Sequence, residues 1–144
     1  MELGTVSYAA KDGIARVVLN RPDQLNAISP GLLEDLDRVC AAVEGDPTVR
    51  AVTLTAAGRA FCAGADLKAV RELSPDPEKW ARFMRLWHRV FNRIEALPVP
   101  VVAGVHGLAL AGGLELTLVA DLVVADEAAR LGDQHANFGL VAGG

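Results

Sequence analysis

Apolar and β-branched residues gather in short runs along the first third of the chain, and these runs predict three strands. Residues 5–9 (TVSYA) and 14–19 (IARVVL) have strand composition, and Asp12-Gly13 between them is a strong hairpin signal. Residues 49–56 (VRAVTLTA) form a β-branched run typical of a buried strand. We therefore expect a hairpin followed by a strand inside a sheet.

Two longer segments repeat apolar residues at helical spacing. Ser29-Pro30 predicts the cap and first turn of one helix, and Asp46-Pro47 predicts its end. A second helix is expected over residues 77–97, with an aromatic stripe that we interpret as core or subunit contact rather than a ligand site. The two stripes comprise Leu32, Leu33, Leu36, Val39, Cys40 and Val43, and Trp80, Phe83, Met84, Trp87, Val90, Phe91 and Ile94.

The second half of the chain continues the alternation. It predicts a strand at 100–106, a glycine-rich turn, a helix at 112–119 and a strand at 121–125. Strands that alternate with helices indicate an α/β protein built in layers. The length suits a single domain over residues 1–144.

Composition narrows the class of protein. The net charge is −4, which argues against nucleic acid as the main partner. Cys40 and Cys62 are too few for a disulfide framework and fit the reduced thiols of a cytoplasmic protein. The N-terminal residues lack the basic region and apolar core of a signal peptide.

Residues 97–114 are apolar enough to resemble a membrane span. The segment contains prolines and glycines and one ionisable side chain, His106, so a buried strand, a turn and a helix start fit it better. We therefore expect no membrane segment. The chain finishes on Gly143-Gly144 after an apparent strand and loop, which we interpret as a cut rather than the end of a domain.

Small residues follow two of the predicted strands, at 61–71 (FCAGADLKAVR) and at 104–116 (GVHGLALAGGLEL). Small residues let a backbone approach a ligand or another element closely. The second stretch also begins a helix, so the amides near Gly112 are unpaired helix-end donors that can hold an oxyanion. Close helix–strand packing selects glycine as well, and both interpretations stay open at this point.

Glu115 lies in an almost wholly apolar helix, and a buried carboxylate is costly without a partner or a role. It is either a proton-transfer group or a glutamate that caps the helix start. The chain has no GxSxG elbow, P-loop lysine, CxxC pair or metal-ligand motif, and GLALAGG lacks the spacing of a dinucleotide-binding turn. The apolar neighbours of Cys62 indicate packing rather than a nucleophile.

Four stretches together resemble the crotonase family, the enoyl-CoA hydratase/isomerase superfamily, in order and spacing. They are LNRPDQLNAIS (19–29), FCAGADL (61–67), PVVAGVHGLALAGGLEL (100–116) and DLVVADEAARLGDQHANFGLVAGG (121–144). The resemblance implies a crotonase-like spiral of ββα units, truncated before the C-terminal helices. It also implies assembly as homotrimers or hexamers.

The resemblance further implies an acyl-CoA substrate, with coenzyme A as part of the substrate and no separate cofactor. The backbone amides of Ala63 and Gly112 would form the oxyanion hole, and Glu115 would move the proton. Lys68 or Arg71 would meet the CoA phosphates. The implied CoA and substrate contacts are Leu25, Ala27, Ala63, Gly64, Ala65, Asp66, Leu67, Lys68 and Gly112.

One departure from the family pattern concerns the reaction. Hydratases of this family usually carry a second glutamate where this chain has His135. A histidine can act as acid or base near neutral pH, or it can simply line the pocket. We expect hydration of a 2-enoyl-CoA. The alternatives are isomerisation, decarboxylation or thioester hydrolysis on the same scaffold, and a non-catalytic subunit that binds acyl-CoA or supports assembly.

Overall fold

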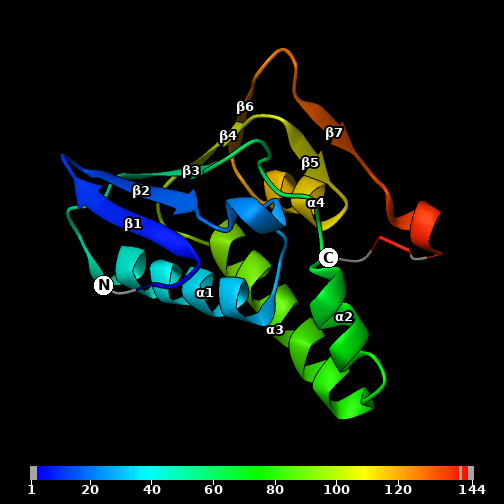
Figure 1. Cartoon of the computed structure of the whole chain (residues 1–144). Helices are drawn as coiled ribbons and strands as arrows, with labels where there is room; N and C mark the ends of the chain where they lie inside the picture. The colour runs from blue at the N-terminus through cyan, green and yellow to red at the C-terminus, as the bar shows by residue number, and fades with distance from the viewer. Residues whose placement is uncertain (1–2, 140, 143–144) are drawn as a thin grey trace.

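The computed structural model describes residues 3–139 and 141–142, and its centre is a five-stranded sheet with the order β1-β2-β3-β4-β6 (Figure 1). The first two strands, β1 (Val6–Lys11) and β2 (Ile14–Leu19), pair antiparallel. Asp12 and Gly13 join them with φ values of 54° and 79°, the left-handed pair that a tight hairpin requires. The predicted hairpin is confirmed.

Three further strands extend the sheet in parallel. They are β3 (Ala51–Ala56), β4 (Val101–Val105) and β6 (Leu122–Ala125), each paired with the preceding strand in the sheet. Parallel strands need helical crossovers between them, and the predicted alternation of strands and helices is thereby confirmed.

A second, smaller layer runs beside the sheet. It contains β5 (Leu108–Leu110) and β7 (Arg130–Gly132), which pair in parallel, and a bridge between Cys62 and Ala109 continues the layer to the segment after β3. Strands β3, β4 and β6 of the large sheet are thus each followed by a shorter extended segment in the second layer. The sequence predicted only a glycine-rich turn where β5 lies, because three residues carry too little periodicity to indicate a strand.

Two long helices cover one face of the large sheet (Figure 1). Helix α1 (Pro30–Gly45) begins where Ser29 Oγ accepts a hydrogen bond from Leu32 N, and α3 (Pro77–Glu95) begins at the Asp76 cap. Both apolar stripes lie in the core, so the aromatic stripe of α3 is mainly a core element. Trp80 and Met84 at its N-terminal half are only partly buried.

Short helices follow β2 and the segments that form the second layer. They are the 3₁₀ helix η1 (Pro22–Gln24), α2 (Leu67–Leu73), α4 (Gly112–Leu118) and the 3₁₀ helix η2 (His135–Phe138). The fourth stretch of the family resemblance, residues 121–144, includes residues 140, 143 and 144, which lie outside the described residues. The predicted cut at Gly143-Gly144 therefore also lies outside them.

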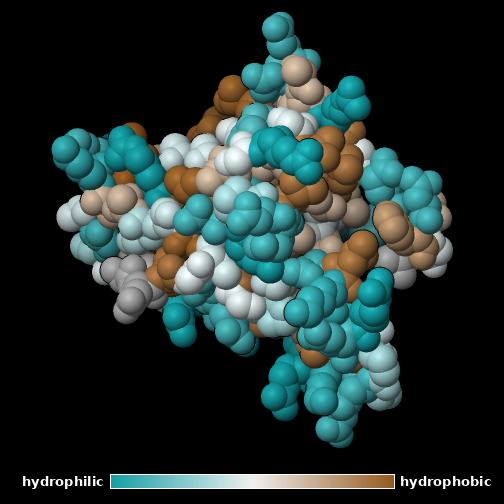
Figure 2. All heavy atoms as spheres, viewed as in Figure 1, coloured by the Kyte–Doolittle hydropathy of each residue, from teal (hydrophilic) through white to brown (hydrophobic). Residues whose placement is uncertain are grey.

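Residues 97–114 contain β4, β5 and the start of α4, as expected from the prolines and glycines of this segment. Among the described residues, no helix is both long enough and apolar enough to cross a membrane. Strand β6 leaves Leu122, Val123 and Val124 exposed. Figure 2 shows apolar side chains gathered over this part of the molecule.

Close packing between α4 and the segment after β3 depends on Gly113. A Cβ atom at this position would lie 2.1 Å from the carbonyl oxygen of Cys62, which is far inside van der Waals contact. The carbonyl cannot move aside, because it accepts a hydrogen bond from Leu110 N at 3.0 Å. Only glycine therefore allows α4 to begin this close to the second layer.

We expect Gly113→Ala to lower the free energy of unfolding by about 1–3 kcal/mol, the usual cost of overpacking. Urea unfolding of the whole protein measures the change. Gly45→Ala is the matched control, because Gly45 is also helical and a Cβ atom added there would have no neighbour within 4 Å. The control should be neutral or slightly stabilising, and an equal loss in both variants would contradict the packing argument.

Candidate functional site

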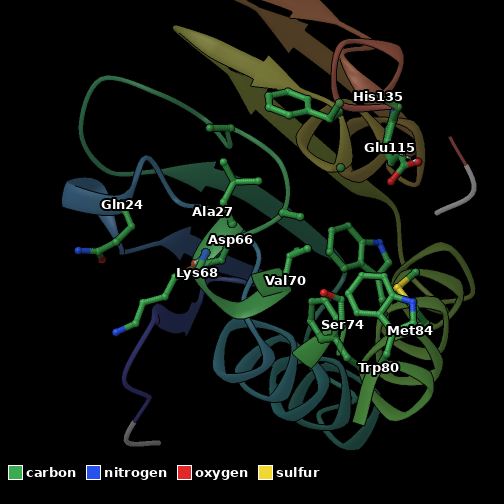
Figure 3. A pocket seen from close by; sticks show the side chains of 18 of the residues that line it. Gln24, Ala27, Asp66, Lys68, Val70, Ser74, Trp80, Met84, Glu115 and His135 are labelled. Atoms are coloured by element: carbon green, nitrogen blue, oxygen red, sulfur yellow. Dashed lines mark hydrogen bonds and ion pairs between the residues drawn. The ribbon is translucent and has the colours of Figure 1, made fainter. Parts of the chain in front are cut away.

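A cavity of about 820 Å³ lies between the second layer, η1, α2 and α3 (Figure 3). Its polar end carries Gln24, Asp66 and Lys68, and its other end carries Glu115 and His135. The apolar wall is formed by side chains of α2 and α3. The lining residues are Gln24, Ala27, Ala63, Ala65, Asp66, Leu67, Lys68, Val70, Ser74, Trp80, Phe83, Met84, Trp87, Ala111, Gly112, Glu115, His135, Phe138 and Val141.

The segment 61–66 forms one wall and is hydrogen-bonded on two sides. Toward the second layer, Phe61 N donates to His106 O and Cys62 N donates to Leu108 O, each at 3.0 Å. Toward the segment that follows η1, Ala63 N donates to Leu25 O at 3.0 Å and Asp66 N donates to Ile28 O at 2.9 Å. The N–H groups of these four residues are therefore all used in backbone pairing.

The amides of Gly64 and Ala65 are the exceptions, and of these two residues only Ala65 lines the cavity. Ile28 bonds to the residues on both sides of Ala65, because its N–H donates to Gly64 O at 2.8 Å and its carbonyl accepts from Asp66. A residue bracketed in this way in a parallel pairing points its own N–H away from the partner. The Ala65 N–H has no acceptor within the part of the chain that the structure describes, and Ala65 lines the cavity.

The sequence led us to expect the Ala63 N–H at the cavity, and this is corrected by the structure: that N–H donates to Leu25 O, and the N–H with no described acceptor beside the cavity is that of Ala65. In a regular strand, the N–H groups that point to one side belong to every second residue. Here the N–H groups that bond to the segment after η1 belong to Ala63 and Asp66, which are three positions apart. Gly64 causes the irregularity with a φ of 101°, a conformation open mainly to glycine. It turns the next amide toward the cavity, while Ala63 remains a lining residue whose N–H is already used.

The second amide belongs to Gly112, the first residue of α4. No described residue accepts a hydrogen bond from its N–H, as is usual for the first turn of a helix. A Cβ atom built on Gly64 would lie 3.5 Å from Gly112 N, so the two small-residue turns are in direct contact. The unpaired amides of Ala65 and Gly112 thus border the same cavity from adjacent turns.

The positions of these turns depend on the buried side chain of Asn26. Its Nδ2 donates to the carbonyl oxygens of Ala57 and Ala60, both at 2.8 Å, and its Oδ1 accepts from Arg21 N at 2.8 Å. Leu25 and Asn26 both adopt left-handed backbone, with φ values of 51° and 53°. This turn presents Leu25 O to Ala63 N, and the sequence analysis gave Asn26 no role.

Glu115 and His135 meet at the end of the cavity that lies away from Lys68 (Figure 3). His135 Nε2 is 3.5 Å from Glu115 Oε1, and the two side chains are only 14% and 11% exposed. The two residues come from different parts of the chain, since Glu115 lies on α4 and His135 lies on η2. Two groups that can each hold a proton therefore lie within reach of one bound molecule.

Asp133 is a third ionisable residue beside this pair, and the sequence analysis did not single it out. Its Oδ1 accepts from the backbone N–H of His135 at 2.9 Å and lies 2.5 Å from His135 Nδ1. Within the described residues, no group of three or more His, Cys, Asp or Glu side chains is arranged to hold a metal ion.

The predicted CoA contacts divide into two groups. Ala27, Ala63, Ala65, Asp66, Leu67, Lys68 and Gly112 line the cavity. Leu25 and Gly64 act through their backbone instead, since Leu25 O accepts from Ala63 and Gly64 sets the direction of the next amide. Arg71 is exposed on α2 and is absent from the lining residues.

Asp66 holds α2 in place and does not project freely into the cavity. Its Oδ2 pairs with Arg21 Nη2 at 2.8 Å, and its Oδ1 caps the helix by accepting from Lys68 N and Ala69 N. Partial burial acts to raise the pKa of Asp66, but the hydrogen bonds from Arg21 and the two amides outweigh it and leave that pKa below its usual range. Arg21, which the sequence analysis missed, also donates to Ala27 O.

Cys62 lies behind the cavity wall and is fully buried. Burial raises the pKa of its thiol to about 12, so the thiolate needed for nucleophilic attack is scarce near neutral pH. This agrees with the prediction that Cys62 is a packing residue.

Comparison with known proteins agrees with this architecture. The model of the enoyl-CoA hydratase/isomerase family matches residues 9–144. The short-chain-enoyl-CoA hydratase of Clostridium acetobutylicum is 38% identical over 144 residues, which cover 99% of this chain and 54% of that protein. The mitochondrial enoyl-CoA hydratase of Pongo abelii is 34% identical over 130 residues, covering 90% and 43%. The chain spans about half the length of these curated relatives.

Solved structures give the same result for the fold. The crystal structure of an enoyl-CoA hydratase from Bacillus anthracis matches with a TM-score of 0.90 at 34% identity, covering 97% of this chain and 54% of that one. An enoyl-CoA hydratase from Shewanella pealeana matches with a TM-score of 0.93 at 27% identity, covering 98% and 54%. These matches confirm the predicted α/β spiral of ββα units.

The Arg21–Asp66 contact predicts a pH dependence of stability. An acid whose pKa is lower in the folded than in the unfolded state stabilises the fold above its unfolded pKa, and that contribution is lost as the pH falls through the folded value. We expect Asp66→Asn to cost about 1.5–3 kcal/mol of unfolding free energy at pH 7, as for hydrogen bonds to charged groups. The cost should shrink toward zero below about pH 4, where the unfolded acid is protonated.

Urea unfolding of the whole protein between pH 7 and pH 3 measures this difference. Glu72→Gln on the same helix is the control, because Glu72 is exposed and makes no ion pair with any described residue. A penalty for Asp66→Asn that does not change with pH would show that the charge of Asp66 contributes nothing.

Proposed function

The chain belongs to the enoyl-CoA hydratase/isomerase family, and on that basis we propose that the whole protein adds water to a 2-enoyl-CoA thioester in the cavity described above. The observation that carries this proposal is the pair of unpaired amides, Ala65 and Gly112, in the same cavity as Glu115 and His135. Relatives that are named enoyl-CoA hydratases support the choice of reaction.

The proposed substrate lies along the length of the cavity. Its thioester oxygen accepts from the Ala65 and Gly112 amides, and its acyl chain extends along the apolar wall of Trp80, Met84 and Trp87. The CoA portion leaves past Asp66 and Lys68, at the end of the cavity away from Glu115 (Figure 3). Coenzyme A is part of the substrate, and the reaction needs no separate cofactor.

The chemistry is a conjugate addition. The oxygen of water forms a bond to Cβ, and the Cα=Cβ electron pair moves through the carbonyl to give an enolate on the thioester oxygen. Two amides aimed at this oxygen lower the barrier by roughly 3–4 kcal/mol each. Glu115 takes the proton that water loses, and the His135 imidazolium gives a proton to Cα as the enolate collapses.

The contact between Glu115 and His135 allows both groups to return to their starting protonation states after each turnover. After one turnover Glu115 holds a proton and His135 has lost one, so a proton must pass between them before the next. The 3.5 Å separation of Oε1 and Nε2 is slightly beyond a normal hydrogen bond. A small approach or one bridging water completes the transfer.

Other reactions of the family would use the same two amides. Isomerisation, decarboxylation and thioester hydrolysis each pass through charge on the thioester oxygen, and product analysis separates them from hydration. A non-catalytic subunit that binds acyl-CoA or supports assembly is the rival from another class, since it needs the amides but neither Glu115 nor His135.

We also propose that the whole protein assembles in the cytoplasm as a homotrimer or a pair of trimers. Exposed apolar side chains support the assembly. Leu118 is 72% exposed, and Leu122 and Val124 on the edge strand β6 are 61% and 65% exposed. Surfaces of this kind are usually covered by another part of the protein or by a partner.

Glu115→Gln in the whole protein is expected to lower turnover of a 2-enoyl-CoA about 10²–10⁴-fold, because glutamine keeps the shape of the side chain but cannot take a proton. Affinity for the acyl-CoA should change little. Steady-state kinetics and isothermal titration calorimetry measure the two quantities separately.

Glu127→Gln is the matched control, because Glu127 is exposed and lies outside the cavity lining. Full turnover by Glu115→Gln on an acyl-CoA that the parent converts would contradict the catalytic assignment. If the parent binds acyl-CoA tightly but converts none, the binding-subunit alternative is correct.

The backbone assignment can be tested by replacing single amides with esters. Incorporation of lactic acid at position 65 removes the Ala65 N–H, and we expect kcat to fall about 10²–10³-fold, as when other enzymes lose an oxyanion-hole donor. Hydration kinetics of a 2-enoyl-CoA provide the measurement.

The ester at position 63 is the control, since the Ala63 N–H donates to Leu25 O and not into the cavity. It should lower the stability measured by urea unfolding and leave kcat largely intact. The opposite result, with kcat lost at position 63 and kept at position 65, would restore Ala63 as the donor.

A further inference from the structure

Asp133 has no role in the reaction proposed above, yet it makes the closest polar contact of the His135 ring. One carboxylate oxygen, Oδ1, accepts from the backbone N–H of His135 at 2.9 Å and lies 2.5 Å from ring atom Nδ1. The first contact fixes the backbone at the start of η2, and the second fixes the rotation of the ring. Asp133 itself is 58% exposed, whereas the His135 side chain is 14% exposed.

Two charged groups face the imidazole. Asp133 approaches Nδ1 from the connection between β7 and η2, and Glu115 approaches Nε2 from α4. Within the described part of the chain, no other charged side chain lies within ion-pair distance of the ring. The two nitrogens of His135 therefore have different partners, one outside the cavity and one inside it.

Asp133 remains an acceptor over the working range of the protein. Hydrogen bonds from the backbone and then from the ring of His135 hold the pKa of Asp133 below its usual range, so the group stays a carboxylate near neutral pH. A carboxylate can only accept. The proton on Nδ1 is thus held in place, and Nε2 is left as the nitrogen that exchanges protons in the cavity.

On the basis of the proposed hydration, we propose that Asp133 is a positioning residue that fixes the tautomer and orientation of His135, so that Nε2 faces Glu115 and the substrate. The neutral ring carries its proton on Nδ1, and the charged ring gives the Nε2 proton to Cα. The Asp133–His135 pair supplies the second acid–base group of the site. Asp133 acts through His135 and does not touch the substrate.

A purely structural explanation must be separated from this one, because aspartate often stabilises a local turn. Asp46 provides the comparison within the same chain. Its Oδ1 accepts from Thr48 N at 2.9 Å and from Thr48 Oγ1 at 2.6 Å, the same two contacts to the residue two positions ahead. Its carboxylate makes no hydrogen bond or ion pair with a histidine in the described part of the chain, and Asp46 is not a lining residue of the cavity.

Nitrogen-15 NMR of the imidazole in the whole protein gives a readout that a structural role would not move. The parent should show neutral His135 protonated on Nδ1, and Asp133→Ala should shift the population toward the Nε2-protonated form. The matched control Asp46→Ala should leave the His135 signals unchanged. A parent ring protonated on Nε2, or a tautomer that Asp133→Ala does not change, would overturn the proposal.

Kinetics provide the second readout. We expect Asp133→Ala to lower kcat at least about tenfold, but by no more than His135→Ala, with little change in KM. In a His135→Ala background, Asp133→Ala should cost nothing further, since the two residues act as one unit. Equal losses from Asp133→Ala with and without His135 would show that Asp133 acts independently and would also overturn the proposal.

Asp133→Asn is used if the alanine variant does not fold. Its side-chain oxygen can still accept from His135, so kcat should lie between those of the parent and His135→Ala, and parent-level kcat would overturn a role for the carboxylate charge. The outcomes also separate this proposal from the hydratase assignment. If Glu115→Gln abolishes turnover but Asp133→Ala changes neither the tautomer nor kcat, hydration stands and positioning fails. A fully active Glu115→Gln would remove the catalytic role of Glu115, and a parent that converts no 2-enoyl-CoA would remove the hydration proposal, while NMR still reports the tautomer in both cases.

Discussion

The candidate site depends on how the backbone hydrogen bonds of residues 61–66 are distributed. Phe61 and Cys62 are bonded to the second layer, and Ala63 and Asp66 are bonded to the segment after η1. Because both sides of this short segment are occupied, the amide of Ala65 is left unpaired at the cavity. Ala65 is half-buried and lines the cavity, so its N–H is available at the place where we propose that the thioester oxygen binds.

Two other features follow from this distribution. Gly64 must adopt its positive φ for the donors of Ala63 and Asp66 to point to the same side. Asn26 must hold the turn at Leu25 for Ala63 to find its acceptor, and it does so through two carbonyl oxygens of the loop that precedes the segment. The amide of Ala65 is therefore set by side chains and turns that never enter the cavity.

Much of the fold could be predicted from the sequence, because its elements are long and periodic or carry strong turn signals. The hairpin at Asp12-Gly13 and the helices after Ser29-Pro30 and at 77–95 are of this kind. The three-residue strands β5 and β7 were harder, since they are defined by pairing with each other rather than by local pattern.

The candidate site was less accessible to sequence reasoning. The choice between Ala63 and Ala65 depends on tertiary hydrogen bonds, which residue types do not encode locally. Position 135 could be located only through the family resemblance, and the contact of Asp133 with its ring required coordinates. Asn26 and Arg21 are ordinary polar residues in sequence, and their importance comes from the buried carbonyl groups and the carboxylate that they reach.

The backbone origin of the two unpaired donors has a consequence for how such a site can evolve. An amide N–H is carried by every residue except proline, so most single-base changes at codons 65 and 112 cannot delete the donor itself, although they can disturb the packing around it. The group at position 135, in contrast, is a side chain that one codon change replaces. In the proposed reaction, the N–H donors for the thioester oxygen are therefore harder to delete by a codon change than the proton-transfer group, although a Cβ atom at position 112 would lie 2.5 Å from Trp87 Cζ2 and packing restricts that position to glycine.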